Sequence, residues 1–321
     1  GPITIRPESV IALTGATGFV GRQFLQDARR RGWSVRPFAG SSGGGSGDGE
    51  DYRPLRLGAG AQIDPADFRG CDTLVHLAAY IPSDHNDLEA AIRCWEVNAL
   101  GTAWLIEAAA TAGVKRFVQM SSANAYAAAQ VTTEDRAPDE RAPMFPASRE
   151  YYFASKIAQE LYAQHACRQA GLSAATLRLS AVYGAAQSSN VVVRLARQLL
   201  AGETVELAGN GAFGVDFVTV GDVSKAILLV LEQGAEGPFN VGSGARTTIV
   251  ELAEQLCELM GAPRDAIILR DDGTPPDRGF AAPDISAIKN LGFAPTALAD
   301  GLCELIEGLS TQPAAIDHRG S

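Results

Sequence analysis

The sequence predicts an α/β fold, in which a doubly wound parallel sheet carries a smaller C-terminal α/β lobe. Short apolar runs alternate with segments whose apolar residues recur at helical spacing, and this alternation is typical of a parallel sheet covered by helices on both faces. A glycine-rich turn joins the first apolar run to the first helical segment. The length of 321 residues is enough for about two domains of roughly 150 residues each.

The expected elements alternate along the chain. Apolar runs bounded by turn residues predict strands at 9–13, 35–39, 73–78, 114–120 and 174–179. Helical spacing predicts helices at 19–31, 87–112, 150–170, 191–201, 223–232 and 249–260. Because the pattern loosens beyond residue 184, we expect a sheet domain at 3–180, a smaller lobe at 181–311, from which some elements can return to the sheet, and a flexible tail at 312–321.

The composition argues against several classes of protein. A formal net charge of −10, from 27 basic and 37 acidic residues, disfavours binding to nucleic acid or to an anionic membrane surface. No apolar stretch approaches the roughly 18 residues that a membrane-spanning helix needs. The five cysteines include no CxxC pair, so we expect neither a disulfide framework nor a metal site, and we interpret them as reduced thiols of a cytoplasmic protein.

Glycine is unusually frequent, with 34 residues in the chain. Residues 40–49 contain six glycines and three serines, a composition typical of a flexible loop. Gly15, Gly18 and Gly21 lie between the first strand and the first helix. Their spacing allows a tight turn, brings backbone N–H groups against a pyrophosphate and lets the helix pack closely on the sheet. The alternative interpretation is a turn with a purely structural role.

A tyrosine and a lysine stand four residues apart near the start of a predicted helix, so Tyr152 and Lys156 share one helical face. An ammonium beside a phenol favours the phenolate, and we therefore expect the pKa of Tyr152 to fall from about 10 toward neutrality, where it can exchange protons. Ser121 and Ser122 follow the strand that ends at Met120, where ligands bind in open α/β sheets. Each feature also has a bland explanation: an exposed tyrosine with a solvated lysine, and a serine that caps a turn.

The order of these motifs is more specific than any one of them. The glycine turn at 14–21 is followed by His-Leu-Ala-Ala at 76–79, Asn-Ala-Leu-Gly-Thr at 98–102, the serine pair, the Tyr152–Lys156 motif and Arg-Leu-Ser-Ala-Val-Tyr-Gly at 178–184. In this order the chain resembles the extended short-chain dehydrogenase/reductase family, in its nucleotide-sugar epimerase/dehydratase group. The resemblance covers residues 10–295.

The resemblance implies a Rossmann-type dinucleotide-binding domain at 3–180, a mainly substrate-binding lobe at 181–311 and bound NAD or NADP. It implies that Tyr152 is the catalytic acid/base, that Lys156 holds the nicotinamide ribose and tunes the tyrosine, and that Ser122, rather than Ser121, orients the substrate. The implied cofactor-binding residues are Gly15, Thr17, Gly18, Phe19, Val20, Gly21, Ala39, Gly40, Ser41, Leu77, Ala78, Ala79, Asn98, Tyr152 and Lys156.

The substrate residues expected from the resemblance are Tyr80, His85, Asn124, Ala181 and Arg278. We expect residues 80–85 to line the mouth of the substrate site. Two interpretations of His85 stay open, an additional acid/base and a loop histidine that faces solvent. We favour the solvent-facing loop histidine.

Departures from the family pattern limit the choice of reaction. Members that convert dTDP-glucose to a 4-keto-6-deoxy sugar carry an Asp-Glu pair after the catalytic Ser or Thr, where this chain has Ala123 and Asn124. We therefore disfavour a 4,6-dehydratase. Members that bind a sugar diphosphate commonly have polar or cationic residues where this chain has Ala181, Val215 and Gly279–Phe280, and Arg278 is displaced from the expected place. A sugar without a nucleotide, or a natural-product alcohol, becomes an alternative substrate.

The end of the second expected strand leaves the choice of cofactor open. NAD-specific members place an acidic residue there to bind the ribose 2′-OH, whereas this chain has Ala39, Gly40 and Ser41. No arginine stands at the matching place for a 2′-phosphate, and Arg36 lies inside the strand. The family favours NAD, and these residues favour neither dinucleotide.

The leading hypothesis is an NAD(P)-dependent enzyme that transfers hydride at a secondary alcohol or ketone of a sugar, a nucleotide sugar for preference, with epimerisation and net ketoreduction both open. The alternatives are a reductase or dehydrogenase of a non-nucleotide natural-product alcohol and a non-catalytic dinucleotide-binding scaffold or sensor. The helices expected at 87–112 and 150–170 correspond to those that pair as a four-helix bundle in dimeric family members, so we expect a homodimer.

Overall fold

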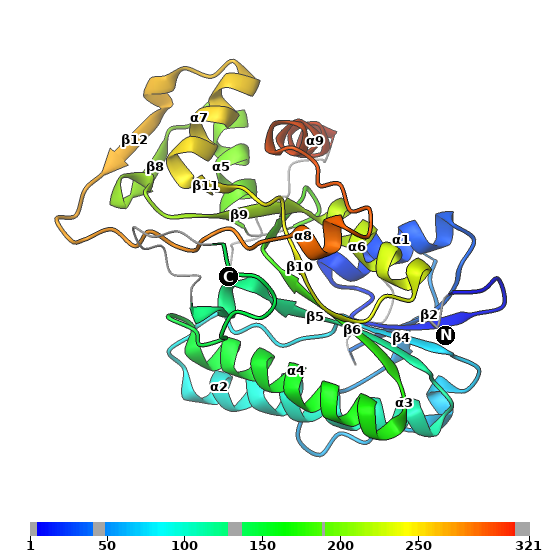
Figure 1. Cartoon of the computed structure of the whole chain (residues 1–321). Coiled ribbons are helices and arrows are strands. Elements are labelled where there is room, and N and C mark those ends of the chain that lie inside the picture. The colour runs from blue at the N-terminus through cyan, green and yellow to red at the C-terminus, as the bar shows by residue number, and fades with distance from the viewer. Residues whose placement is uncertain (1–4, 41–48, 128–136, 188–189, 312–321) are drawn as a thin grey trace, which may run out of the picture.

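A computed structural model describes residues 5–40, 49–127, 137–187 and 190–311 (Figure 1). A seven-stranded sheet forms its centre, with strand order β10-β6-β5-β4-β1-β2-β3, and every neighbouring pair is parallel. The strands are β1 (Val10–Thr14), β2 (Ser34–Ala39), β3 (Arg53–Pro54), β4 (Thr73–His76), β5 (Arg116–Ser122), β6 (Ser173–Leu179) and β10 (Gly237–Val241). The predicted doubly wound parallel sheet is confirmed.

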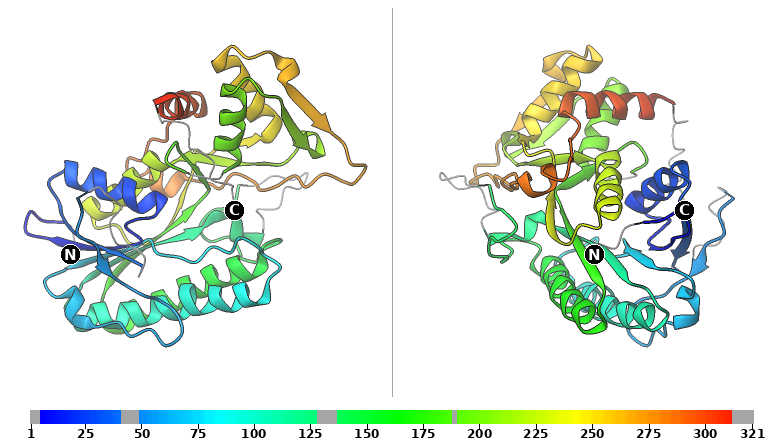
Figure 2. Two further views of the ribbon diagram at one scale, coloured as in Figure 1. Left: turned by 180° about the vertical axis from the view of Figure 1, so that it is seen from behind. Right: turned by 45° about the vertical axis from the view of Figure 1, so that its right-hand side comes forward.

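Helices cover both faces of this sheet, as Figures 1 and 2 show. On one face lie α1 (Phe19–Arg30) and α6 (Val220–Gln233), and on the other α2 (Leu88–Cys94), α3 (Gly101–Thr111) and α4 (Glu150–Ala170). Successive side chains of β5 point to opposite faces of the sheet. Val118 belongs to the hydrophobic core under α1 and α6, while Phe117 belongs to the core under α3 and α4. Strands buried on both sides explain the continuous apolar runs of the sequence.

A smaller lobe is built from the C-terminal part of the chain. Its three-stranded sheet has the order β11-β9-β7, and β12 pairs with β8 in a separate two-stranded sheet. These elements are β7 (Ala181–Tyr183), α5 (Val191–Leu200), β8 (Val205–Ala208), β9 (Gly214–Thr219), β11 (Arg246–Thr248), α7 (Ile249–Met260), β12 (Ile267–Arg270), α8 (Ser286–Lys289) and α9 (Leu298–Thr311). A second core fills the space between α5, α7 and α9. The chain returns from β9 through α6 to β10, so the large sheet receives its last strand from beyond residue 181.

Two sequence expectations need correction. The helical stretch expected at 87–112 is interrupted, because Trp95–Leu100 between α2 and α3 is a π-helical segment. The strands β3, β7–β12 and the helices α8 and α9 were not expected, since they are short or contain glycine and proline. Residues 41–48 of the glycine-rich segment and the tail at 312–321 lie outside the described residues.

All five cysteines are free, and four of them are buried. In the parts of the chain that the structure describes, no helix has the length and apolarity needed to cross a membrane.

Candidate active site

The turn after β1 requires glycine at two positions. Gly15 has φ +65°, and a Cβ there would lie 2.6 Å from the backbone nitrogen of Ala78. Gly21 lies in the first turn of α1, where a Cβ would overlap the carbonyl oxygen of Gly15. The turn is anchored to the neighbouring strand by the bond from Ala16 N–H to the Phe38 carbonyl, at 3.1 Å. Helix α1 therefore approaches the turn after β1 more closely than any side chain at residue 21 would allow.

The N-terminus of α1 is suited to an anion. Its N-cap residue is Gly18, no side chain caps the helix, and its first turn contains no acidic residue. The first-turn N–H groups and the positive end of the helix dipole are thus left for a ligand phosphate. Phe19 packs its ring against Gly184, and Val20 is partly buried against the core. These residues fit the pyrophosphate of a dinucleotide.

A cavity of about 790 Å³ extends from this turn along the carboxyl ends of the strands. The predicted cofactor and substrate residues that line it are Gly15, Thr17, Gly18, Ala39, Gly40, Leu77, Ala78, Ala79 and Tyr80. Phe19, Val20 and Gly21 lie behind the turn on α1, and Ser41 lies outside the described residues. Two cations of the lining, Arg56 and Arg93, were not expected from the sequence.

These cations differ from Arg36 in what they contact. Arg93 places its guanidinium 4.5 Å from the centre of the Tyr80 ring. Arg36 instead donates to the carbonyls of Asp67 and Arg69, at 2.9 and 2.8 Å. Arg56 is exposed and lines the cavity together with Ala39 and Gly40, which places a cation near the end of β2.

A buried histidine fixes the end of β4. The Thr14 hydroxyl oxygen accepts from the N–H groups of Leu77 and Ala78, both at 3.1 Å, so its proton is donated to His76 Nδ1 at 2.7 Å. His76 Nε2–H then donates to Thr102 Oγ1 at 2.8 Å. Burial, reinforced by Lys156, lowers the pKa of His76 to about 3. His76 is therefore a neutral structural link in this wall.

The π-helical segment places Asn98 between two parts of the site. Asn98 accepts from Tyr80 N–H at 2.8 Å and donates to the Tyr80 carbonyl at 2.9 Å and to Ser155 Oγ at 3.1 Å. Ser155 in turn donates to the Tyr152 carbonyl at 2.6 Å. Such π-bulges are frequent at functional sites. Asn98 thus ties the loop after β4, which lines the cavity, to the helix that carries Tyr152 and Lys156.

Tyr152 and Lys156 lie on α4, as the spacing predicts. Burial raises the pKa of Tyr152 to about 12, with Cys94 adding to the rise and Arg149 opposing it. Lys156 donates from Nζ to Gln159 Oε1 at 2.7 Å, and burial lowers its pKa to about 8. The expectation that Lys156 depresses the pKa of Tyr152 is wrong for this arrangement, because burial dominates and the ammonium is bonded to Gln159.

His85 lies beside Tyr152, with ring centroids 6.2 Å apart in an edge-to-face arrangement. Its Nδ1 is covered from solvent and has no hydrogen-bond partner among the described residues. Burial and the nearby Arg149 lower the pKa of His85. His85 is therefore a half-buried loop residue whose ring packs against Tyr152, and its role as an additional acid/base or as a loop histidine stays a prediction.

The two serines that end β5, Ser121 and Ser122, face opposite ways, as successive residues of a strand do. Ser121 is buried, and its Oγ has no partner in the described residues. Ser122 is half-buried, and its Oγ accepts from the Asn124 N–H at 3.1 Å. Ala123 is buried against Tyr126. The two positions after Ser122 are Ala123 and Asn124, so neither holds a carboxylate. Of the two serines, Ser122 is therefore the more accessible to a ligand.

The lobe has small or apolar residues at the positions where contacts to a sugar diphosphate would be expected. Val215 is buried in β9, and Ala181 packs on the same core. Gly279 touches Gly214 so closely that a Cβ would overlap its carbonyl oxygen, and Phe280 packs edge-to-face on Phe213 at 6.0 Å. Arg278 is exposed, and its carbonyl oxygen accepts from Gly214 N–H and Arg246.

No metal-binding cluster accompanies these residues: within the described chain, no group of three or more His, Cys, Asp and Glu side chains is placed to hold an ion. The site therefore consists of a glycine turn, a long cavity, and a tyrosine and lysine on one helix. A family model described as the NAD dependent epimerase/dehydratase family matches residues 11–242. The chain belongs to this family.

Proteins similar to this chain are named for different reactions. A dTDP-glucose 4,6-dehydratase of Streptomyces niveus is 31% identical, over 92% of this chain and 91% of the relative. A UDP-glucose 4-epimerase of Mycolicibacterium smegmatis is 29% identical, over 92% of this chain and 96% of the relative. The solved structure of MoeE5 in complex with UDP-glucose and NAD has a TM-score of 0.77 at 27% identity, and the match covers 94% of this chain and 99% of that one.

The comparisons confirm the resemblance to extended short-chain dehydrogenases/reductases. They give no support to disfavouring a 4,6-dehydratase, because two relatives that are 31% and 30% identical carry that name. Epimerases and reductases stand at comparable identity, at 29% and 28%. The choice among these reactions therefore depends on the residues around Tyr152 and Ser122.

Proposed function

We propose that this chain is an NAD(P)-dependent enzyme that transfers hydride at a secondary alcohol or ketone carbon of a nucleotide sugar, as an epimerase or a ketoreductase. The observation that carries the proposal is the placement of Tyr152 and Lys156 on α4, tied through Asn98 to the loop that lines the cavity. NAD is the dinucleotide we prefer, since neighbours such as MoeE5 bind it. Bound NAD(P) supplies the hydride acceptor and donor.

The residues of this chain supply binding and proton transfer. The first-turn N–H groups of α1 bind the pyrophosphate, with Gly15 and Gly21 permitting the approach. Lys156 donates to the nicotinamide ribose, and Ser122 donates to the substrate oxygen. Tyr152 removes the hydroxyl proton as the alcohol becomes a ketone and returns it in the reverse step. Because the pKa of Tyr152 is about 12 before ligands bind, the proton transfer requires that Lys156 and the cofactor's positive nicotinamide favour the phenolate.

The residues after Ser122 favour these reactions over elimination of water. Elimination needs an additional acid and base beside the ketone, and Ala123 and Asn124 provide neither. Hydride transfer needs only the Tyr152 proton. The 31% identity to a dTDP-glucose 4,6-dehydratase makes that reaction the competing outcome of the test.

Tyr152→Phe is the first prediction. We expect turnover to fall about 10²–10⁴-fold, because the variant keeps the ring but cannot transfer the proton. The purified protein is supplied with NAD or NADP and with UDP-glucose or dTDP-glucose, and products are identified by NMR while the absorbance of the reduced nicotinamide is followed. An epimer with unchanged cofactor indicates the epimerase, net consumption of cofactor indicates oxidoreduction, and a 4-keto-6-deoxy product indicates the dehydratase.

Tyr151→Phe is the matched control, since Tyr151 is the exposed neighbour on the same helix. It should retain wild-type turnover. Full activity in Tyr152→Phe would contradict the proposal. Dinucleotide binding without turnover of any sugar or ketone would instead support a scaffold or sensor.

A second candidate is hydride transfer on a non-nucleotide alcohol. The observation that favours it is that Val215, Gly279 and Phe280 stand where a sugar diphosphate would need polar or cationic side chains, and that the nearby Arg246 donates to the carbonyls of Phe280 and Arg278. Charge-assisted hydrogen bonds to a diphosphate contribute about 1.5–3 kcal/mol each, so their loss weakens such a ligand substantially. Calorimetric titration with UDP and with dTDP distinguishes the candidates, because a nucleotide-sugar enzyme binds one of them and the second candidate binds neither.

We also propose that the chain forms a homodimer through α3 and α4. Large apolar side chains on the outer face of these helices are exposed, among them Trp104 at 56% and Leu161 at 61%. A hollow between the helices is lined by Leu100, Trp104 and Tyr162. A contiguous apolar face of this kind marks an interaction surface, and a second copy would cover it with the same residues.

The double replacement Trp104→Glu with Leu161→Glu is the second prediction. We expect it to convert the dimer to a monomer, with the dissociation constant raised roughly 100-fold or more, because carboxylates would be buried at the interface centre. Light scattering coupled to size-exclusion chromatography measures the mass. Leu269→Glu, at an exposed apolar residue of β12, is the control and should leave the dimer intact. A monomeric wild-type chain would refute the proposed interface.

The free thiols indicate the cellular compartment that we propose. All five cysteines are unpaired, and four are buried. Unpaired thiols are typical of reducing compartments, so we place the enzyme in the cytoplasm.

A further inference from the structure

Lys156 is the end of a chain of buried hydrogen bonds that leads away from the site. Lys156 is only 4% exposed, and its Nζ donates to Gln159 Oε1 at 2.7 Å. Gln159 Nε2 donates to Gln119 Oε1 at 3.0 Å, and Gln119 Nε2 donates to Thr176 Oγ1 at 3.0 Å. The chain thus crosses from α4 through β5 to β6.

Donor and acceptor chemistry allows one polarity for this chain. An ammonium only donates, so the oxygen of the Gln159 amide must face Lys156 and its nitrogen must face Gln119. Gln119 therefore presents its oxygen to Gln159 and its nitrogen to the Thr176 hydroxyl, which accepts. Gln119 is 2% exposed and Gln159 is 1% exposed, so little of either side chain is open to solvent. Both amides are thus oriented by Lys156 and by each other.

We propose that Gln159 and Gln119 are positioning residues of the active site, which keep the Lys156 ammonium charged and fixed in place. The inference rests on the proposed function, in which Lys156 binds the nicotinamide ribose. An ammonium donates up to three hydrogen bonds, so the bond to Gln159 leaves two for a ligand. With one N–H held by Gln159, the orientation of the ammonium, and so of the two remaining donors, is restricted.

Apart from Gln159, few neighbouring groups stabilise the charged form of Lys156. Glu160 follows on the same helix and opposes the effect of burial on the pKa of Lys156, which is lowered to about 8. Its carboxylate is paired with Arg178 of β6 at 2.7 Å, with both side chains about 10% exposed. His76 of β4 is neutral, and Tyr152 carries its proton in the ligand-free state. Gln159 is therefore the acceptor in direct contact with the ammonium.

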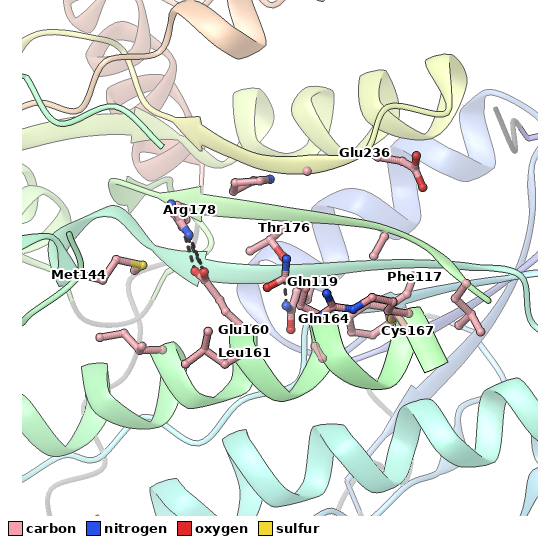
Figure 3. A pocket seen from close by; sticks show the side chains of 17 residues that line it. Phe117, Gln119, Met144, Glu160, Leu161, Gln164, Cys167, Thr176, Arg178 and Glu236 are labelled. Atoms are coloured by element: carbon pink, nitrogen blue, oxygen red, sulfur yellow. Dashed lines mark hydrogen bonds and ion pairs between the residues drawn. The ribbon is translucent and has the colours of Figure 1, made fainter. Parts of the chain in front are cut away.

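The far end of this series of hydrogen bonds, at Gln119 and Thr176, reaches a second cavity, which Figure 3 shows from close by. This cavity, of about 580 Å³, is lined by Gln119 and Thr176 and also by Gln164 of α4. Figure 3 shows the bond between Gln119 and Thr176 and, separately, the pair formed by Arg178 and Glu160. Gln164 takes no part in the hydrogen bonds that lead to Lys156, which makes it a matched control on the same helix.

The test is a direct titration of the Lys156 side chain. The sequence contains four lysines, Lys115, Lys156, Lys225 and Lys289, so lysine-selective isotope labelling gives four side-chain NMR signals. The signal that disappears in Lys156→Arg identifies Lys156. In the wild-type chain we expect it to titrate near pH 8. The measurement needs neither substrate nor turnover.

Two substitutions at Gln159 should move this titration in opposite directions. Gln159→Leu removes the acceptor, and Lys156 should titrate about one pH unit lower. Gln159→Glu supplies a charged acceptor of the same size, and Lys156 should titrate about one pH unit higher; Gln119 can turn its amide to donate to the new carboxylate. Gln119→Leu frees the Gln159 amide and should lower the titration by a smaller amount.

Gln164→Leu should leave the titration of Lys156 unchanged. Identical titrations in wild type, Gln159→Leu and Gln159→Glu would overturn the proposal, as would an equal shift in Gln164→Leu. If Gln159→Leu fails to fold, Gln159→Glu carries the test, because its volume is unchanged. A failed titration refutes the positioning role alone, since the proposed reaction is tested separately by Tyr152→Phe.

Discussion

Replacing Glu160 with glutamine is expected to lower the free energy of unfolding by about 3–5 kcal/mol. Glu160 of α4 accepts from Arg178 of β6 at 3.0 Å from Nε and 2.7 Å from Nη2, and both side chains are about 10% exposed. Burial opposes the charge on Arg178, and its bonds to Glu160 outweigh burial and raise its pKa. The variant would leave a buried guanidinium without its counter-charge, and this uncompensated charge is the source of the cost.

The effect should extend beyond the pair. Arg178 Nη1 also donates to Tyr126 Oη at 3.0 Å and to the Glu140 carbonyl at 2.9 Å, and Tyr126 donates to Asn240 of β10 at 2.5 Å. The cluster therefore joins α4, β6 and β10. Since α4 carries Tyr152 and Lys156, we expect Glu160→Gln to weaken turnover as well as the fold.

Denaturant-induced unfolding measures the loss as a lower midpoint with an unchanged slope. The control is Glu206→Gln in the exposed pair of Glu206 with Arg270, whose side chains are 59% and 60% exposed. That change should cost less than about 1 kcal/mol, because solvent screens exposed pairs. Equal losses in the two variants would show that burial does not govern the Glu160 pair.

Local signals were enough to predict α4, which carries Tyr152 and Lys156, and α7 of the smaller lobe. The expected boundaries 150–170 and 249–260 coincide with α4 and α7. Helix α7 begins with a capping box formed by Thr248 and Glu251, and α4 ends at Gly171 in a left-handed conformation. Both are short-range features that the residue types specify directly. The spacing of Tyr152 and Lys156 could be interpreted for the same reason.

Features that depend on contacts between distant residues could not be predicted from the sequence. Strand β10 begins with Gly237-Pro238 and becomes a strand because it pairs with β6 at the edge of the sheet. Gln119 and Gln159 are 40 residues apart, and no local pattern relates them. The pKa of Tyr152 was predicted to fall because the lysine was considered without burial, which is a property of the folded chain. Gln159 did leave one signal, since it lies three residues after Lys156 on a predicted helix.

Replacing Gly21 with alanine is expected to reduce the affinity for NAD roughly 5- to 150-fold, which corresponds to about 1–3 kcal/mol of overpacking. Helix propensity alone predicts the opposite sign for stability, because alanine is favoured over glycine inside a helix by about 1 kcal/mol. The close approach decides the outcome. A Cβ at residue 21 would overlap the Gly15 carbonyl oxygen, which is backbone and cannot rotate away. Helix α1 must then move outward, and its first-turn N–H groups leave the place where the pyrophosphate binds.

Gly221→Ala is the matched control, because Gly221 also lies in the first turn of a helix, α6, and a Cβ there would meet nothing closer than Thr219 Oγ1 at 3.9 Å. That variant should bind NAD as the wild type does and gain slightly in stability, as propensity predicts. Fluorescence titration with NADH and denaturant-induced unfolding measure both quantities. If Gly21→Ala binds NADH with wild-type affinity, the contact of α1 with the turn is not what positions the helix for the dinucleotide. A loss confined to Gly21→Ala would instead locate the requirement at the contact with Gly15, since both variants add the same methyl group to a helical turn.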